Sequence, residues 1–216
     1  MIHDLSFDIE TGMPTCGTPW HQSVEVSQMG RLDDVGRNTH RIVLGSHSGT
    51  HLDAPYHFIE SGITVEKLDV NLMWGLATAV DLRSKGAGST VTIDDVREID
   101  VKERLIFVFG WYHKWKTENY YSDFPYFETD AIEYLIDNGM RVMALDTPSP
   151  DDGGFIKENR GIDSPNHVLL LKNKVLVIEY LNNTDFLLGG REYEYVALPL
   201  KVKGSDGCPA RVLIRE

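Results

Sequence analysis

The sequence predicts a mixed α/β protein, because it contains many short segments typical of strands and only a few typical of helices. The strand candidates are apolar or alternate between apolar and polar residues. One of them, Lys174–Leu181, is a nearly continuous apolar run, as expected for a strand covered on both faces. The predicted strands are Arg41–Gly45, Leu76–Leu82, Arg104–Phe109, Arg141–Leu145, Lys174–Leu181, Tyr193–Val202 and Ala210–Ile214.

Two segments carry the signals of a helix. Thr92 is followed by Ile-Asp-Asp-Val, and acidic residues in a first turn complement the helix dipole. Asp130 with Glu133 resembles a capping box for a helix over Ala131–Asn138. Gly139 then stands where a glycine commonly ends a helix.

Composition predicts one globular domain over residues 1–216, because 42% of the residues are hydrophobic and no repeat or linker divides the chain. A net charge of −12 argues against a nucleic-acid partner, and no apolar run approaches the roughly 20 residues that span a bilayer. The two cysteines, Cys16 and Cys208, form neither a disulfide framework nor a metal-binding spacing. Together with the absence of a basic or hydrophobic leader segment, this predicts a cytoplasmic location.

The chemistry is concentrated in one segment, Ser46-His47-Ser48-Gly49-Thr50-His51-Leu52-Asp53-Ala54-Pro55-Tyr56-His57-Phe58. Three of the eight histidines and one aspartate fall within it. Imidazole and carboxylate form the ligand set of a catalytic divalent metal, with zinc as first choice and manganese as the alternative. In an extended chain, residues 47, 51, 53 and 57 point the same way, and the glycine and proline predict a kinked ribbon folded over one point. The simpler alternative is an ordinary turn with unrelated histidines.

The second half of the chain supplies further candidate ligands. Glu179 lies inside an apolar strand, where an unpaired carboxylate costs several kcal/mol, so it is protonated, paired with a cationic side chain or bound to a cation. His167 lies twelve residues earlier and also has apolar neighbours. With the first cluster, the two residues complete a coherent set of metal ligands.

These segments resemble the cyclase family of metal-dependent hydrolases, which includes bacterial kynurenine formamidases (arylformamidases) and isatin hydrolases. The central motif is Ser-Gly-Thr-His-Leu-Asp-Ala-Pro-Tyr-His-Phe, and the separation of His167 from Glu179 also matches. The supporting pieces are Asp4-Leu-Ser, Gly12-Met-Pro, Gly110-Trp111, Ala144-Leu-Asp-Thr-Pro-Ser149 and Ala197-Leu-Pro-Leu200. The resemblance implies a swivelling β/β/α fold with a central mixed sheet or barrel-like core, and a homo-oligomer (dimer or tetramer).

The resemblance also implies a site with two divalent metal ions. His47, His51 and Asp53 would hold one ion, and Asp53, His167 and Glu179 the other, with Asp53 shared. His57 is then the catalytic acid/base. The expected reaction is hydrolysis of a small amide C–N bond by metal-activated hydroxide. The rival is a metal-binding protein of the same fold without catalysis, and His57, which ligation does not need, favours the enzyme.

The substrate is less constrained than the chemistry. Kynurenine formamidases of this type carry a Trp-Pro-Gly-Asp stretch near the N-terminus, whereas this chain has Met13-Pro-Thr-Cys-Gly-Thr-Pro-Trp20. An arylformamide is the first expectation, because the metal motif matches formamidases and the aromatic segment 111–127 offers planar surfaces for an aryl ring. The different N-terminal stretch leaves a cyclic amide of the isatin type, or another small amide or ester, as the alternative.

Aromatic residues and one further aspartate complete the candidate site. The segment 111–127 holds eight aromatic residues, so it forms either the wall of a pocket for a planar substrate or a packed loop or subunit contact. Trp20, Trp111 and Trp115 are the candidate substrate-binding residues. Asp146 ends a predicted strand, where it either orients a ligand histidine or simply forms a turn before Thr147-Pro-Ser.

Overall fold

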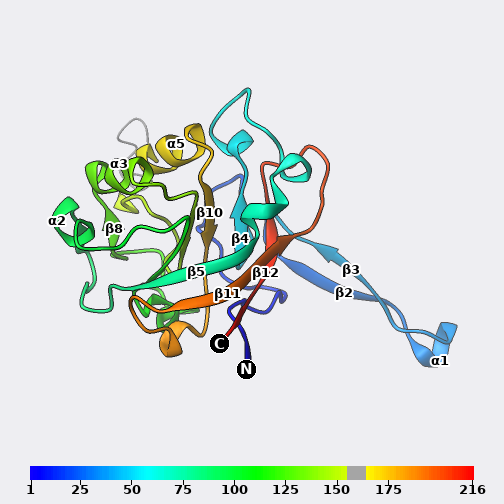
Figure 1. The fold of residues 1–216 in the computed structure, drawn as a ribbon. Helices are drawn as coiled ribbons and strands as arrows, with labels where there is room; N and C mark the ends of the chain where they lie inside the picture. Colours follow the sequence, from blue (N-terminus) through cyan, green and yellow to red (C-terminus); the bar gives the residue numbers. More distant parts are fainter. Residues whose placement is uncertain (155–163) are drawn as a thin grey trace.

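The protein is built around one eight-stranded mixed sheet that curls into a barrel-like core (Figure 1). The computed structural model describes residues 1–154 and 164–216. The strands follow the order β1-β12-β11-β5-β7-β9-β10-β4, and β4 also pairs with β12, which closes the core. Their bounds are β1 Ile2–Asp4, β4 His51–Asp53, β5 Trp74–Asp81, β7 Arg104–Val108, β9 Val142–Leu145, β10 Leu176–Glu179, β11 Glu192–Pro199 and β12 Gly207–Arg215. This architecture confirms the mixed α/β class and the barrel-like core.

Strands β5, β7, β9 and β10 run parallel and separate two hydrophobic clusters. Alternate residues of β7 point to opposite faces, as the pleat of a strand requires. Ile106 belongs to the cluster inside the barrel with Leu52, whereas Phe107 belongs to the outer cluster with Ile132. The outer cluster is covered by α2 (Ile93–Val96), α3 (Thr129–Asp137) and α5 (Pro165–Lys172) (Figure 1).

A two-stranded arm leaves this body near the N-terminus (Figure 1). It consists of β2 (Glu25–Gly30) and β3 (Thr39–Val43), with the short helix α1 (Leu32–Val35) at the tip. A second small sheet pairs β6 (Thr90–Val91) with β8 (Tyr126–Phe127). Single turns of 3₁₀-helix are η1 Pro55–His57, η2 Val65–Lys67, η3 Val70–Leu72, η4 Trp111–Lys114 and η5 Thr184–Phe186.

The predicted elements match the structure in kind and differ at their ends. Every predicted strand overlaps an observed one, with β3 displaced toward the N-terminus of its predicted range. Thr92 and Asp95 form a reciprocal capping box on α2. Helix α3 begins earlier than predicted, because Glu128 is its N-cap residue and Asp130 lies in the first turn. In the described part of the chain, no helix has the length and hydropathy to cross a bilayer.

Strand β4 places the metal-binding motif at the seam of the barrel. It lies between β10 and β12, with Glu179 of β10 opposite His51 and Gly207 of β12 opposite Asp53. Leu52 between them is fully buried in the barrel core. Because side chains alternate along a strand, His51 and Asp53 share the opposite face of β4.

Candidate metal centre and active site

The histidine and aspartate motif converges on one point, although not as the predicted extended ribbon. Only residues 51–53 are a strand, so that part of the prediction is wrong. His47 lies in a turn made possible by Gly49, whose φ of 62° is in the region that glycine adopts without strain. His57 ends the 3₁₀ turn that starts at Pro55. The side chains therefore meet because a tight turn lies on each side of β4. They do not meet because alternate residues of one long strand point the same way.

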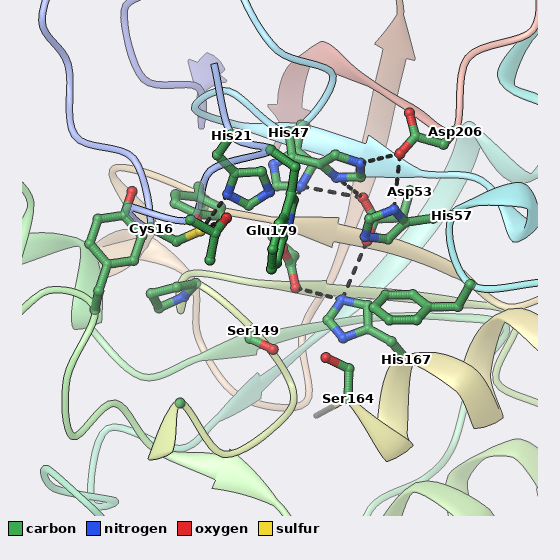
Figure 2. Close-up of a pocket in the computed structure, with 18 of the residues that line it drawn as sticks. Cys16, His21, His47, Asp53, His57, Ser149, Ser164, His167, Glu179 and Asp206 are labelled. Carbon is green, nitrogen blue, oxygen red and sulfur yellow. Dashed lines mark hydrogen bonds and ion pairs between the residues drawn. The ribbon is translucent and has the colours of Figure 1, made fainter. Parts of the chain in front are cut away.

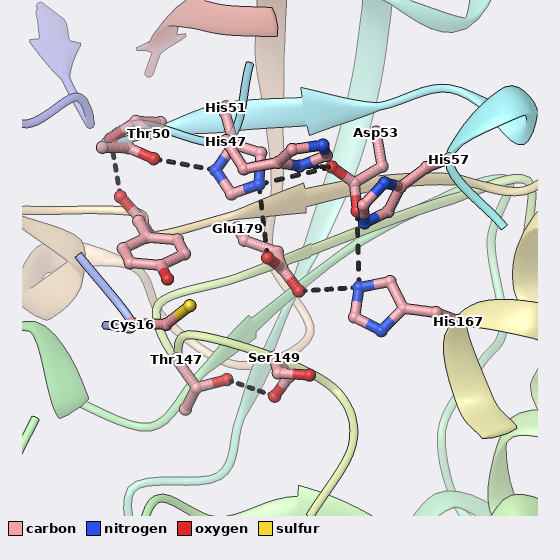
Figure 3. A network of polar contacts seen from close by, with 12 residues as sticks. Cys16, His47, Thr50, His51, Asp53, His57, Thr147, Ser149, His167 and Glu179 are labelled. Atoms are coloured by element: carbon pink, nitrogen blue, oxygen red, sulfur yellow. Dashed lines mark hydrogen bonds and ion pairs between the residues drawn. The ribbon is translucent and has the colours of Figure 1, made fainter. Parts of the chain in front are cut away.

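The five residues predicted as metal ligands lie together (Figure 3). The Nδ1 atom of His47 is 2.8 Å from Oδ1 of Asp53, and Nε2 of His51 is 3.3 Å from the same oxygen. Nε2 of His167 lies 3.3 Å from Oδ2 of Asp53 and 3.0 Å from Oε1 of Glu179. Glu179 also approaches His51, with 3.4 Å between Oε2 and Nε2. Asp53 is thus the residue that contacts all three histidines.

The donor atoms of this cluster fit a divalent cation. Asp53 is 1% exposed and Glu179 is 5% exposed. Both carboxylate oxygens of Asp53, Oε1 of Glu179 and Nε2 of His51 are buried without a well-formed hydrogen bond to any described residue. Buried carboxylates without such partners are costly, and a bound cation removes that cost. Two groups have their donor atoms within 4.8 Å of one another: His47, Asp53 and His57, and His51, Asp53 and Glu179.

The electrostatics of the cluster follow from this crowding of carboxylates and imidazoles. Burial alone disfavours every charged form, but Asp53 and Asp206 raise the pKa of His47 to about 10. Burial likewise opposes protonation of His167, yet Glu179, Asp151 and Asp53 raise its pKa well above the usual value. Against its own burial, Asp53 has its pKa held well below the usual value, first by His47. The carboxylates of the cluster therefore stabilise positive charge at this place, whether on an imidazole or on a metal ion.

Two aspartates that the sequence did not single out hold the rings from outside. Oδ2 of Asp151 accepts from Nδ1 of His167 at 2.6 Å. Oδ2 of Asp206 lies 2.8 Å from Nε2 of His47 and 3.0 Å from Nδ1 of His57 (Figure 2). Although burial raises the pKa of Asp206, these two hydrogen bonds lower it far below the ordinary value. Both aspartates lie in irregular segments, where the sequence does not distinguish an aspartate that binds a histidine from one that forms a turn.

Asp146 does not orient a ligand histidine, so that prediction is wrong. Its carboxylate accepts from the backbone N–H groups of Phe109 and Gly110 at 2.9 and 2.8 Å, and from the Thr184 hydroxyl at 2.7 Å. It therefore ties the end of β7 to the segment after β10. Full burial raises the pKa of Asp146 to about 6, against the effect of these hydrogen bonds.

A cavity of about 510 Å³ opens onto the cluster, with His47, Asp53, His57, His167 and Glu179 on its lining (Figure 2). Its aromatic lining includes Trp20, Phe58, Tyr121, Phe124 and Tyr180. Tyr121 and Phe124 belong to the segment 111–127, so this segment forms part of the cavity wall, which was one of the two roles predicted for it.

The tryptophans of the aromatic segment do not line this cavity. Trp111 is 5% exposed and its indole N–H donates to the Tyr120 carbonyl at 2.9 Å. Trp115 stacks on Phe7 with ring centroids 4.3 Å apart. Neither side chain reaches the cavity, whose lining from this segment is Tyr121 and Phe124 instead. Trp20 remains on the lining and is 71% exposed.

Comparison with known proteins also identifies the family of this chain. The model of the family Cyclase, described as putative cyclase, matches residues 3–152. The chain belongs to the Cyclase family.

The chain is similar in sequence to known proteins over most or all of its length. A kynurenine formamidase of Erythrobacter litoralis is 27% identical, over 100% of this chain and 94% of that protein. One from Geobacillus thermodenitrificans is 30% identical over 83% of this chain and 80% of its own length. A predicted metal-dependent hydrolase from Bacillus stearothermophilus superposes with a TM-score of 0.75 at 29% identity, covering 99% of this chain and 97% of the other.

The same fold is found in a structure of lower sequence identity. Isatin hydrolase A from Labrenzia aggregata has a TM-score of 0.87 at 22% identity, covering 99% of this chain and 93% of the other. The protein described here is accordingly a metal-dependent amide hydrolase, and its cluster of His, Asp and Glu side chains supports binding of a divalent metal.

Proposed function

We propose that the protein hydrolyses an arylformamide, with His57 as the acid/base at a centre held by His47, His51, Asp53, His167 and Glu179. The observation that carries this proposal is the convergence of these residues on one cavity, with His57 beside the cluster. Relatives named kynurenine formamidase support the formamide, and the aromatic side chains on the cavity lining offer surfaces for an aryl ring.

The proposed site holds two metal ions. His47, His51 and Asp53 would hold one, Asp53, His167 and Glu179 the other, with zinc as first choice and manganese as the alternative. In support, Asp53 presents Oδ1 to His47 and His51 and Oδ2 to His167, as a shared ligand would. When bound, a divalent metal would polarise the carbonyl and lower the pKa of water toward neutrality.

In the proposed reaction, the oxygen of water bonds to the formyl carbon, the carbon–nitrogen bond breaks, and a proton passes to the leaving nitrogen. His57 is the group that transfers this proton, because its Nδ1 is hydrogen-bonded to Asp206 and its Nε2 makes none of the described hydrogen bonds. Trp20, Tyr121 and Phe124 would pack against the aryl ring and orient the amide toward the cluster.

A substrate panel tests this function. Protein reconstituted with zinc or with manganese is assayed with formanilides, N-formylkynurenine, isatin and simple lactams. Turnover of the formyl compounds is the expected result. Turnover confined to isatin and lactams would replace the formamidase proposal by ring opening, which the isatin hydrolase fold and the different N-terminal segment favour as the alternative. Metal analysis of the same samples gives the number of ions per chain.

The proposal includes a homo-oligomer, a dimer or tetramer, assembled through the arm β2–β3. Met29 is 68% exposed and Ile42 is 58% exposed on this arm, and Leu32 and Val35 are exposed at its tip. Several exposed large apolar side chains on one projecting segment suit an interface between subunits. Light scattering should show an oligomer that Met29→Lys with Ile42→Lys dissociates. Asp33→Lys, a charge change at the same tip, should leave it intact, and a monomeric wild-type protein would refute the proposal.

A further inference from the structure

Asp206 immediately precedes β12, and its main chain is fixed by the barrel itself. The Ala54 N–H, directly after β4, donates to the Asp206 carbonyl at 2.8 Å. The next residue, Gly207, pairs with Asp53 in the sheet. The main chain at residue 206 is therefore anchored by contacts that do not involve its side chain.

One carboxylate oxygen of Asp206 serves two rings with different roles in the proposed reaction (Figure 2). Oδ2 lies 2.8 Å from Nε2 of His47 and 3.0 Å from Nδ1 of His57. A carboxylate only accepts hydrogen bonds, so both ring nitrogens must carry the proton. Nδ1 of His47 faces the Asp53 carboxylate, so it too carries a proton unless a metal ion takes that proton's place. With a metal at Nδ1, the contact with Asp206 would keep the remaining proton of His47 on Nε2, and in His57 it leaves Nε2 open for proton transfer.

The two rings are also packed against each other, with centroids 4.0 Å apart. A shared acceptor in front of such a pair holds both rings at once. Without Asp206, His57 would lose the hydrogen bond that orients its ring, and His47 would keep only its contact with Asp53.

Gly207 gives independent evidence that this segment is shaped around His47. A Cβ atom at position 207 would lie 2.7 Å from Cε1 of His47 and 3.0 Å from the Leu52 carbonyl oxygen. Only a residue without a side chain lets β12 approach the ring this closely. The close approach is what brings the Asp206 carboxylate into hydrogen-bonding distance.

We propose that Asp206 is a positioning residue that sets the tautomer and orientation of His47 and His57 together, and so links metal binding to proton transfer. This inference rests on the proposed function for the role of His57. Outer carboxylates that orient a ligand histidine typically contribute about 10- to 100-fold to metal affinity or activity. Because Asp206 contacts both rings, its loss should lower both quantities.

The test combines Asp206→Ala with His57→Ala. Zinc affinity is measured by competition with a chelating dye, and kcat and KM with the substrate that the wild-type enzyme turns over fastest. Asp206→Ala should weaken zinc binding and lower kcat at saturating zinc, each by about 10- to 100-fold, with KM little changed. His57→Ala should keep zinc affinity. In the double variant kcat should equal that of His57→Ala within about twofold, while zinc affinity falls as in Asp206→Ala.

Two further variants guard this test. Asp206→Asn has the same shape and keeps one oxygen acceptor, so it should show smaller losses of the same two quantities and replaces Asp206→Ala if that variant does not fold. Glu66→Gln is the matched control, because Glu66 Oε2 accepts from the Gly204 N–H of the same loop at 3.0 Å and touches neither ring. It should behave as wild type.

The outcomes separate this inference from the proposed function. Unchanged zinc affinity in Asp206→Ala, or a kcat loss that adds in full to that of His57→Ala, would overturn the role of Asp206. If Asp206→Ala and Glu66→Gln lost zinc affinity to the same extent, the role of Asp206 would also be overturned, because the loss would then come from a loosened loop. If the wild-type enzyme turned over none of the substrates, the proposed function would fail, and unaltered zinc affinity in Asp206→Ala would still refute the positioning of His47.

Discussion

Asp151→Ala is expected to weaken both the fold and the metal site, through different atoms of the same carboxylate. Oδ1 of Asp151 accepts from the Asn166 N–H at 2.6 Å, and Oδ2 accepts from the His167 N–H at 3.1 Å. Oδ2 also holds the His167 ring at Nδ1, 2.6 Å away. The first two bonds satisfy the start of α5, and the third points Nε2 of His167 at Asp53 and Glu179.

The magnitudes follow from these contacts. Asp151→Ala leaves two buried backbone N–H groups without an acceptor, at about 1–3 kcal/mol each, so the free energy of unfolding should fall by about 2–6 kcal/mol. Loss of the orienting bond to His167 should weaken metal binding by about 10- to 100-fold. Urea unfolding in the presence of a chelator measures the first quantity, and zinc competition titration of the folded protein measures the second.

Asn166→Ala is the matched control for Asp151→Ala. The Asn166 amide donates to the carbonyls of Phe127 and Pro150 at 2.8 and 3.0 Å, and it touches no proposed metal ligand. This variant should lose stability by a similar mechanism and keep its zinc affinity. If Asn166→Ala lost as much zinc affinity as Asp151→Ala, the effect would come from a loosened α5, and the reasoning about the His167 ring would be refuted.

The remaining predictions concern the cluster itself. His57→Ala should keep its metal while kcat falls by about 10²–10⁴, whereas Asp53→Ala should lose metal and activity together; equal metal loss in both, seen by elemental analysis, would make His57 a ligand. Zinc added to chelator-treated protein at about 100 times its dissociation constant should raise the free energy of unfolding by about 2.7 kcal/mol, measured in urea; no change would mean that the folded cluster does not bind it. Gly207→Ala should weaken zinc binding because its Cβ would press on the His47 ring, and wild-type zinc affinity would show that the ring has room to move.

The sequence predicted the fold class and the residues of the cluster because both depend on local signals. Apolar strands such as Lys174–Leu181 are visible in the chain, and Glu179 stood out because a carboxylate in such a strand needs a partner. The extended ribbon around His51 was wrong because turns at Gly49 and Pro55 bring the same side chains together by another path.

What the sequence could not provide were contacts between distant segments. Asp206 lies far along the chain from His57, and nothing local separates it from an aspartate in a surface turn. Trp111 was expected at the cavity, but a large aromatic ring gains more from burial in the core, with its N–H bonded to the Tyr120 carbonyl. The exposed arm β2–β3 also escaped the full prediction, since its pairing depends on a partner strand rather than on its own pattern.

The three-residue strand β4 has a thermodynamic consequence, because the strand that closes the barrel also carries His51 and Asp53. A short strand contributes few backbone hydrogen bonds, and here it carries two fully buried polar side chains whose burial is costly until a cation binds them. In the ion-free protein, β4 should therefore be among the first segments to open, and its amide hydrogens should exchange faster than those of β7. A metal ion that binds only the closed arrangement of β4 would stabilise that arrangement. The availability of metal would then control how often the barrel opens at β4 as well as the chemistry beside it.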